Sequence, residues 1–128
     1  MMDTNRALFL QLEQMMDSKQ LFLNARLRQE DITQMLDIDK EFLTKLIHEH
    51  SGCPNLQVYV NHWRVRYALR LMFKYPELTI KSISHMCGMD YLSTFNRAFR
   101  EFYGQTPSEY RKKIMNLIKT DNCNGSVR

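Results

Sequence analysis

Apolar residues recur along this chain at intervals of three and four, which is the period of an amphipathic α-helix. Near the start the apolar stripe consists of Leu8, Phe9, Leu12, Met15 and Met16. Alternation of apolar and polar residues, which is typical of strands, is not convincing anywhere, and glycines and prolines are few. The pattern therefore predicts an all-α fold, with a first helix from Asn5 to Asp17 whose apolar stripe faces a core.

Six further helices are predicted from the same period and from residues that start or stop helices. Pro76 ends a long helix, Thr79 and Thr106 can cap the helices that follow them, and Gly88 and Gly104 suit turns. The predicted helices run from Gln29 to Leu36, Lys40 to about His50, Leu56 to Tyr75, Ile80 to Cys87, Asp90 or Tyr91 to about Phe102, and Pro107 to about Ile118. At roughly 1.5 Å per residue, the longest of them spans about 30 Å.

Two pairs of these helices repeat one another in sequence. Each pair is a short helix, a tight turn and a second helix, which is the helix-turn-helix pattern. The corresponding residues are Ile32, Leu36, Ile38, Leu43, Ile47 and Gly52 in the first unit and Ile83, Cys87, Met89, Phe95, Phe99 and Gly104 in the second. The offset grows from 51 to 52 residues across the turn, so the second turn is one residue longer. Gly88 can adopt the left-handed conformation that such a turn needs, and Asp37 has to adopt it in the first unit at modest cost.

The repeat divides the chain into five expected segments. Residues 1–20 form an N-terminal amphipathic helix, residues 21–55 the first helix-turn-helix subdomain, residues 56–75 a linker helix and residues 76–118 the second helix-turn-helix subdomain. Residues 119–128 have little to bury and are expected to be a disordered tail. A single helix-turn-helix pattern is a weak signal, but two copies joined by a long helix are much more specific.

Charge is distributed unevenly along the chain, whose net charge is +4. Residues 31–60 hold two basic and five acidic residues, a net charge of −3, whereas residues 61–120 hold eleven basic and four acidic residues, a net charge of +7. A local excess of this size favours a polyanionic partner, although a basic surface can also serve solubility alone.

Other functional classes find little support in the sequence. No stretch approaches the roughly 18 uninterrupted apolar residues of a membrane span, and residues 1–6 are too polar to begin a secretory signal. We therefore expect an intracellular protein without membrane contact. The histidine pairs on the predicted helices lack a matched Cys, Asp or glycine-rich loop, so we expect no catalysis, cofactor or metal. Cys87 lies on a predicted apolar face and is expected to be a buried packing residue.

The stretch from Ser82 to Arg111, SISHMCGMDYLSTFNRAFREFYGQTPSEYR, resembles the signature of the AraC/XylS family of bacterial transcription regulators. The matching positions are Phe95, Arg97, Phe99, Arg100, Gly104, Thr106, Pro107, Tyr110 and Arg111. The likeness extends through the linker, YVNHWRVRYALRLM, and covers roughly residues 21 to 113. The first unit departs from the pattern, with Asp37 in place of the usual glycine and Arg28 in place of a capping Ser or Thr. The resemblance implies that two helix-turn-helix units bind double-stranded DNA sequence-specifically.

In this family the second helix of each unit enters the major groove, where side chains meet base edges and flanking groups hold phosphates. By this resemblance, the base-edge candidates are Glu41, Thr44, Lys45, Ser93, Asn96 and Arg97. The phosphate candidates are Lys40, Thr94, Arg100, Arg111, Lys112 and Lys113. Glu41 either accepts a hydrogen bond from a cytosine or only complements the helix dipole. Trp63 and Arg64 are expected to tie the linker to the units.

Two functions of different classes remain open from the sequence. The first is the DNA-binding domain of an AraC-type regulator, cytoplasmic and associated with the bacterial nucleoid, with two recognition helices in successive major grooves. Its further partners would be RNA polymerase and a sensor or dimerisation domain outside this chain, unless the chain is a short stand-alone member. The second is a helical protein-interaction module, which would share the apolar stripes and the repeat but show little salt-dependent affinity for duplex DNA.

Overall fold

The computed structural model describes the backbone of residues 3–127 and the side chains of residues 3–118. Over that part of the chain it contains seven α-helices, one short 3-10 helix and no strand, which confirms the predicted fold class. The elements are α1 (Thr4–Ser18), η1 (Leu21–Leu23), α2 (Gln29–Leu36), α3 (Lys40–Ser51), α4 (Leu56–Lys74), α5 (Ile80–Met86), α6 (Leu92–Tyr103) and α7 (Pro107–Val127).

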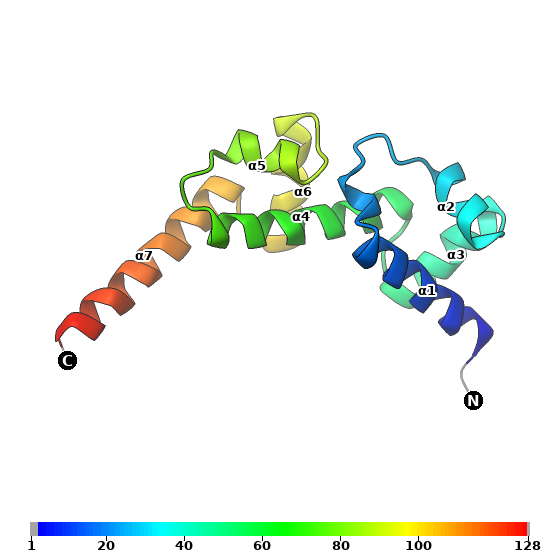
Figure 1. The fold of residues 1–128 in the computed structure, drawn as a ribbon, viewed down its shortest axis with the longest axis horizontal. Coiled ribbons are helices and arrows are strands. Elements are labelled where there is room, and N and C mark those ends of the chain that lie inside the picture. Colours follow the sequence, from blue (N-terminus) through cyan, green and yellow to red (C-terminus); the bar gives the residue numbers. More distant parts are fainter. Residues whose placement is uncertain (1–2, 128) are drawn as a thin grey trace.

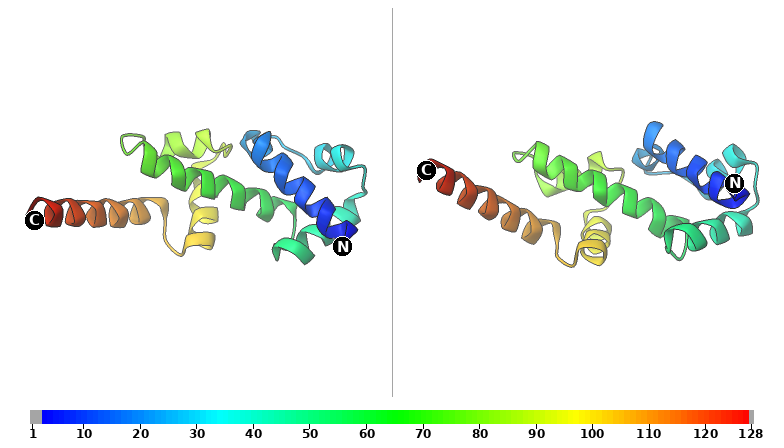
Figure 2. Two further views of the ribbon diagram at one scale, coloured as in Figure 1. Left: turned by 60° about the horizontal axis from the view of Figure 1, so that its bottom comes forward. Right: turned by 90° about the horizontal axis from the view of Figure 1, so that it is seen from below.

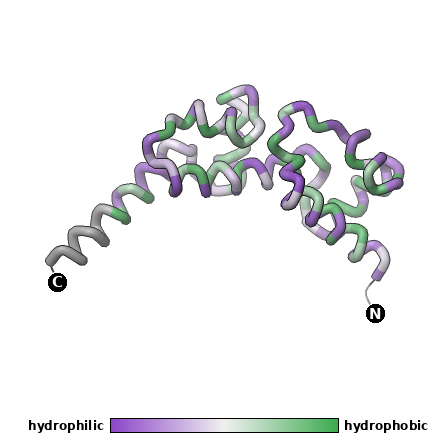
Figure 3. Tube along the Cα trace, viewed as in Figure 1, coloured by the Kyte–Doolittle hydropathy of each residue, from purple (hydrophilic) through white to green (hydrophobic). Residues whose placement is uncertain are grey.

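The long helix α4 runs through the middle of an elongated molecule (Figure 1). The elements α1, η1, α2 and α3 gather around its N-terminal half, whereas α5 and α6 pack on its C-terminal half and α7 extends away from them. Each helix carries both hydrophobic and hydrophilic residues along its length (Figure 3), as expected of helices that each bury one face. The two halves of α4 therefore serve two separate cores.

Each helix-turn-helix unit has its own buried core. The first core consists of Phe9, Leu12, Met16, Phe22, Ile32, Leu36, Leu43, Leu46, Ile47, Cys53, Tyr59 and Val60. The second consists of Val65, Ala68, Leu71, Met72, Ile83, Cys87, Met89, Phe95, Ala98 and Phe99. Helix α1 belongs to the first core, because its Leu12 and Met16 are fully buried there. Burial raises the pKa of the Cys87 thiol to about 12, as expected of a packing residue.

The internal repeat is visible in the backbone of the two turns. In the first turn the Ile38 N–H donates to the Thr33 carbonyl at 3.1 Å, and in the second the Met89 N–H donates to the Ser84 carbonyl at 2.9 Å. Asp37 and Gly88 both adopt positive φ angles, 55° and 91° respectively. Asp37 therefore takes the left-handed conformation that the repeat predicts for it, without the freedom that glycine has.

The structure differs from the predicted pattern of helices in two places. The last helix does not stop near Ile118 but continues to Val127, so the backbone of the predicted disordered tail is helical as far as the structure describes it. No proline follows Pro107 to interrupt the hydrogen bonds along the helical backbone. The segment between α1 and α2, for which no helix was predicted, contains η1, whose Phe22 is buried in the first core. A helix of three residues is too short to produce a periodic signal in sequence.

Candidate nucleic-acid interface

Helix α3 presents a polar ridge on the side that faces away from the first core. Its Leu43, Leu46 and Ile47 are buried. On the opposite side Glu41, Lys45 and His48 are exposed, at the spacing of four and three residues that places side chains on one helix face. A hollow of about 630 Å³ lies along this side, and its lining includes these three residues, Lys40 and Thr44.

Helix α6 presents the corresponding ridge in the second unit. It buries Phe95, Ala98 and Phe99 and exposes Ser93, Arg97 and Arg100 on the opposite side. Asn96 and Thr94 lie half-buried on the two flanks of this ridge. Each exposed position of the α3 ridge corresponds to an exposed position of the α6 ridge that lies 52 residues later in the chain. This is the offset of the sequence repeat in the second helix of each unit.

The match also identifies His48, which the sequence analysis did not select as a contact. His48 occupies the position of Arg100 and lines the hollow beside Glu41 and Lys45. The offset of 52 residues was sufficient to find it, because it pairs His48 with Arg100, which belongs to the family signature.

The two helices begin differently. At the start of α3 the Asp39 carboxylate accepts a hydrogen bond from the Phe42 N–H at 2.8 Å. The residue before α6 is Tyr91, which makes no side-chain cap. The first backbone N–H groups of α6 therefore lack a carboxylate cap, and the positive end of its dipole is better suited to an anion than that of α3.

The two helices that carry these ridges lie on one side of the molecule. The two views of Figure 2 place α3 and α6 on the same side of α4. Most of the expected contact residues belong to these two helices: Lys40, Glu41, Thr44 and Lys45 to α3, and Ser93, Thr94, Asn96, Arg97 and Arg100 to α6. The remaining three, Arg111, Lys112 and Lys113, lie on α7.

Two arginines have structural roles. Arg64 of α4 is 5% exposed and donates from Nε to the Phe22 carbonyl at 2.7 Å and from an Nη to the Asn24 carbonyl at 2.9 Å. Its burial lowers the pKa of its guanidinium. Arg111 is half-buried and donates to the carbonyls of Leu78 and Tyr75. These hydrogen bonds confirm the expected structural role of Arg64, and they give Arg111 a structural role that the sequence did not predict.

Trp63 takes part in the same tie as Arg64. Its ring stacks on Phe22 with 5.7 Å between centroids. The Arg66 guanidinium also lies over the Trp63 ring, 4.6 Å from the ring centroid. Its Nε1 is buried and has no hydrogen-bond partner. Trp63 therefore holds the linker against η1 by ring packing.

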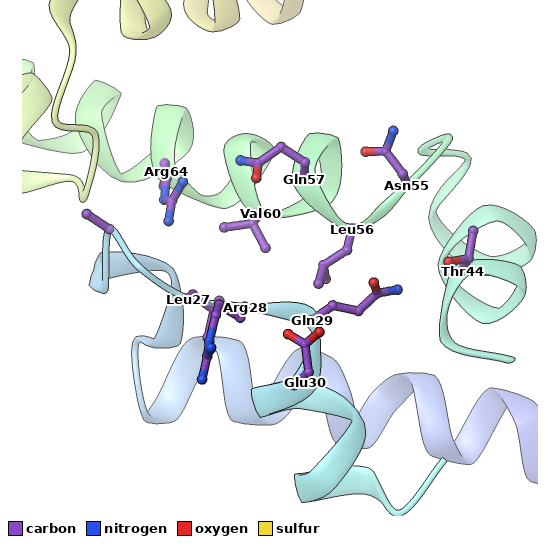
Figure 4. A pocket seen from close by; sticks show the side chains of 11 residues that line it. Leu27, Arg28, Gln29, Glu30, Thr44, Asn55, Leu56, Gln57, Val60 and Arg64 are labelled. Atoms are coloured by element: carbon purple, nitrogen blue, oxygen red, sulfur yellow. The ribbon is translucent and has the colours of Figure 1, made fainter. Parts of the chain in front are cut away.

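A polar pocket of about 570 Å³ opens between the loop after η1, the start of α2, α3 and the start of α4 (Figure 4). Gln29, Thr44, Asn55 and Gln57 supply neutral hydrogen-bonding groups to its wall. Because these residues come from separate segments, no local motif in the sequence could reveal the pocket. Its wall shares Thr44 with the hollow along α3, so it borders the candidate surface.

Among the residues whose placement is described, no group of three or more His, Cys, Asp or Glu side chains could hold a metal ion. Within the same residues, no helix has the length and apolar character needed to cross a membrane.

Residues 32–113 match the model of a protein family that is described as a helix-turn-helix domain. The Msm operon regulatory protein of Streptococcus mutans is 29% identical over 90 residues, which cover 70% of this chain and 32% of that protein. The HTH-type transcriptional regulator YijO of Escherichia coli is 32% identical over 87 residues, which cover 68% of this chain and 30% of that protein. This chain thus spans about a third of the length of these relatives.

Solved structures share the fold. The C-terminal domain of the two-component response regulator yesN from Fusobacterium nucleatum superposes with a TM-score of 0.67 at 22% identity, covering 83% of this chain and 98% of that one. The C-terminal domain of AraT, a response regulator from Geobacillus stearothermophilus, superposes with a TM-score of 0.63 at 25% identity, covering 72% of this chain and 74% of that one. These likenesses agree with two helix-turn-helix units joined by a long helix.

Proposed function

This chain belongs to the AraC-type helix-turn-helix family of DNA-binding transcription regulators, and from that premise we propose that it reads double-stranded DNA sequence-specifically with two helices, α3 and α6, in successive major grooves. The observation that carries this proposal is the pair of helices α3 and α6, which lie on one side of α4 and have matching exposed polar residues. A duplex presents successive major grooves on one face about one turn apart, roughly 34 Å. Two reading helices on one side of a molecule suit that arrangement.

In the second unit, Ser93, Asn96 and Arg97 are the base-edge residues of the proposal. Arg97 is exposed at the centre of the ridge, and an arginine fork can bond guanine O6 and N7. Asn96 lies on the flank and can bond adenine N6 and N7. Each such pair contributes about 1–3 kcal/mol of discrimination against a wrong base.

In the first unit, Glu41, Thr44 and Lys45 are the corresponding residues. Asp39 already caps the start of α3, so the helix has less need of Glu41 for this purpose, and we favour a cytosine contact for its carboxylate. The Thr44 hydroxyl donates to the Lys40 carbonyl at 3.1 Å, which leaves its methyl group and oxygen lone pairs for a base edge. Lys45 is exposed between Glu41 and His48.

Phosphate contacts are proposed for Lys40, Thr94, Arg100, Lys112 and Lys113. Lys40, Arg100 and the two α7 lysines are exposed, and Thr94 lies at the uncapped start of α6, where backbone N–H groups can bind an anion. Arg111 is left out because its guanidinium bonds two backbone carbonyls. Such contacts add affinity without reading sequence.

Further partners follow from the length of the relatives. Because this chain spans about a third of each of them, we propose that it acts with a sensor or dimerisation domain and contacts RNA polymerase at the promoter. A place at the bacterial nucleoid follows from the same proposal.

The proposal is tested by selecting bound sequences from a random duplex library and measuring stoichiometry on the selected site. We expect an asymmetric site of about two helical turns, bound by one protein copy, since one chain carries both reading helices. Electrophoretic shifts at rising protein concentration should show a one-to-one complex. A requirement for two protein copies on a palindrome would contradict the proposal, as would an absence of any selected sequence.

A further inference from the structure

The turn of the second unit touches the backbone of the first. Gly88 is buried and has a φ of 91°. A Cβ at this position would lie 2.6 Å from the Phe22 carbonyl oxygen and 2.9 Å from the Leu23 carbonyl oxygen. Both atoms belong to the backbone of η1 and cannot swing away as the end of a side chain can. Glycine is therefore required here twice, for the left-handed turn and for the approach of the two units.

The same η1 backbone is held by the linker helix. The Phe22 carbonyl that faces Gly88 also accepts the hydrogen bond from Arg64 Nε, and Arg64 reaches the Asn24 carbonyl as well. Phe22 is 1% exposed, with its ring against Trp63 and Tyr67 at centroid distances of 5.7 and 5.6 Å. The segment that meets Gly88 is thus fixed to α4 by hydrogen bonds and by ring packing.

This contact lies close to the start of a reading helix. A small cleft of about 150 Å³ beside it is lined by Ala25 of the first unit, by Gln57 of α4, and by Gly88 and Thr94 of the second unit. Thr94 is in the first turn of α6, which begins at Leu92. A shift of the Gly88 turn would therefore move the start of α6 relative to α3.

We propose that Gly88 is a positioning residue whose contact with η1, fixed through Arg64, sets the number of base pairs between the two half-sites that the protein accepts. The inference rests on the proposed function, because spacing matters only if both α3 and α6 read DNA. One additional base pair moves a half-site by about 3.4 Å and turns it by roughly 35° around the duplex. Two units held rigidly together cannot follow such a change, whereas two units that rock about α4 can.

The chain provides a matched control in Gly104. This glycine closes α6 in the same unit with a φ of 76°, and a Cβ there would meet no atom within 4 Å. Gly104→Ala therefore places an L-residue in the same left-handed region as Gly88→Ala, but without the collision with the first unit. Any difference between the two variants reports the contact and not the backbone strain.

The first measurement uses the free protein. Residual dipolar couplings of backbone amides show whether the two units share one orientation. For wild type and Gly104→Ala, we expect the couplings of both units to fit one alignment tensor, and for Gly88→Ala we expect two. A single, unchanged tensor for Gly88→Ala would overturn the proposal, and this result does not depend on DNA binding.

The second measurement uses DNA. The duplexes carry both selected half-sites. The spacing between the half-sites is left unchanged, shortened by one base pair, or lengthened by one or two base pairs. For wild type and Gly104→Ala, one inserted base pair should lower affinity by about tenfold or more, because simultaneous engagement of both units is lost. For Gly88→Ala the penalty should fall below about threefold, or the preferred spacing should change, while affinity for each isolated half-site stays the same.

The outcomes separate the two proposals. If wild type binds the selected site without a spacing preference, or if the two alanine variants have the same spacing profile, the role of Gly88 is wrong while DNA reading stands. If wild type binds no duplex, the proposed function fails. The dipolar couplings then still show whether the contact between Gly88 and η1 fixes the orientation of the two units. If Gly88→Ala does not fold, Arg64→Lys replaces it in both measurements, because lysine keeps the charge but lacks the planar fork whose separate nitrogens bond the two carbonyls, and the same changes are expected.

Discussion

Burial separates the arginines of this chain into two kinds. Arg64 and Arg111 direct their guanidinium groups at backbone carbonyls, where they join segments that are distant in sequence. Arg97 and Arg100 are exposed on the ridge of α6 and have no such partners among the hydrogen bonds described. Residue type and charge alone do not distinguish these roles: Arg97, Arg100 and Arg111 all belong to the family signature, yet only Arg111 bonds backbone carbonyls. The difference is one of location, which the fold decides.

Arg97 and Lys112 should affect DNA binding differently. Replacement of Arg97 by Ala is expected to weaken the selected site by about 1–3 kcal/mol and to relax the preference at one base pair, since a base contact is lost. Replacement of Lys112 by Ala should weaken all sequences alike, because a phosphate contact carries no sequence information. Sequence profiling of both variants checks this. Equal, sequence-blind losses would show that Arg97 only contacts a phosphate.

His62 should make stability depend on pH. Its ring stacks on Phe102 with 4.4 Å between centroids, and burial, followed by the nearby Arg66 cation, lowers its pKa below 6.5, an effect that Glu13 partly offsets. As the pH falls below about 6.5, the unfolded chain binds the proton more readily than the folded one, so stability is lost through that window and unaffected above it. The variant His62→Gln should lose less stability on acidification.

Urea unfolding at several pH values between about 7.5 and about 5 measures this effect. His85→Gln is the control, since His85 is an exposed histidine on α5 and its removal also deletes one imidazole. If the pH dependence of His62→Gln equals that of wild type, the stacked ring is not its source.

At the scale of elements, α3 and α6 share one shape but differ in electrostatics. Both have 12 residues, end at a glycine with positive φ and expose a ridge at the same register. The ridge of α3 mixes Glu41 with Lys45 and follows the Asp39 cap, whereas α6 has two arginines on its ridge and no carboxylate at its start. Favourable non-specific contact with phosphates should therefore come mainly from the second unit.

The salt dependence of binding tests this division. Neutralising Arg97 and Arg100 together should lower the slope of log affinity against log salt by about two units, because roughly 0.9 counterions are released per phosphate neutralised. Replacing Lys40 and Lys45 by Ala should change the slope less, since nearby carboxylates already offset their charge. Affinities measured on the selected duplex over a range of salt concentrations give both slopes. Equal changes for the two pairs would contradict the division of labour.

The sequence was most informative where local chemistry determines the structure. The start of α2, the starts of α3, α4, α5 and α7, and the two left-handed turns were all predicted within a residue or two, because caps and turn residues act over a few positions. The end of α7 was missed because residues 119–128 have little to bury and include Asp, Asn and Gly, which favour a helix weakly. The contact between Gly88 and η1 could not be predicted, since the turn alone already explains a glycine there.

The candidate surface shows the same limit. The register of the repeat predicted that the outer positions of α3 and α6 correspond, and the structure gathers these helices on one side of α4. The role of Arg111 was missed because its carbonyl partners, Leu78 and Tyr75, are more than thirty residues away in the chain. Non-local contacts of this kind leave no periodic or local signal in one sequence.

At the scale of the whole molecule, two cores share one helix. The N-terminal half of α4 belongs to the first core and the C-terminal half to the second. Tyr67 packs against both, and the η1 segment joins the first core to Arg64 and to the turn at Gly88. These ties should make the two units unfold together in spite of their separate cores.

Removal of the Arg64 tie should separate the unfolding of the two units. Arg64→Met keeps much of the side-chain volume but leaves the Phe22 and Asn24 carbonyls without their charged donor, at a cost of about 1.5–3 kcal/mol for each hydrogen bond. The loss falls mainly on the first core, where the single tryptophan, Trp63, packs. In urea, wild type should show one transition by Trp63 fluorescence and by far-ultraviolet circular dichroism, whereas in Arg64→Met the fluorescence transition should come first. Arg66→Met, which removes an exposed arginine beside the same ring, should keep the two signals coincident. Coincident transitions in Arg64→Met would mean that the continuous helix α4 is sufficient to couple the two units.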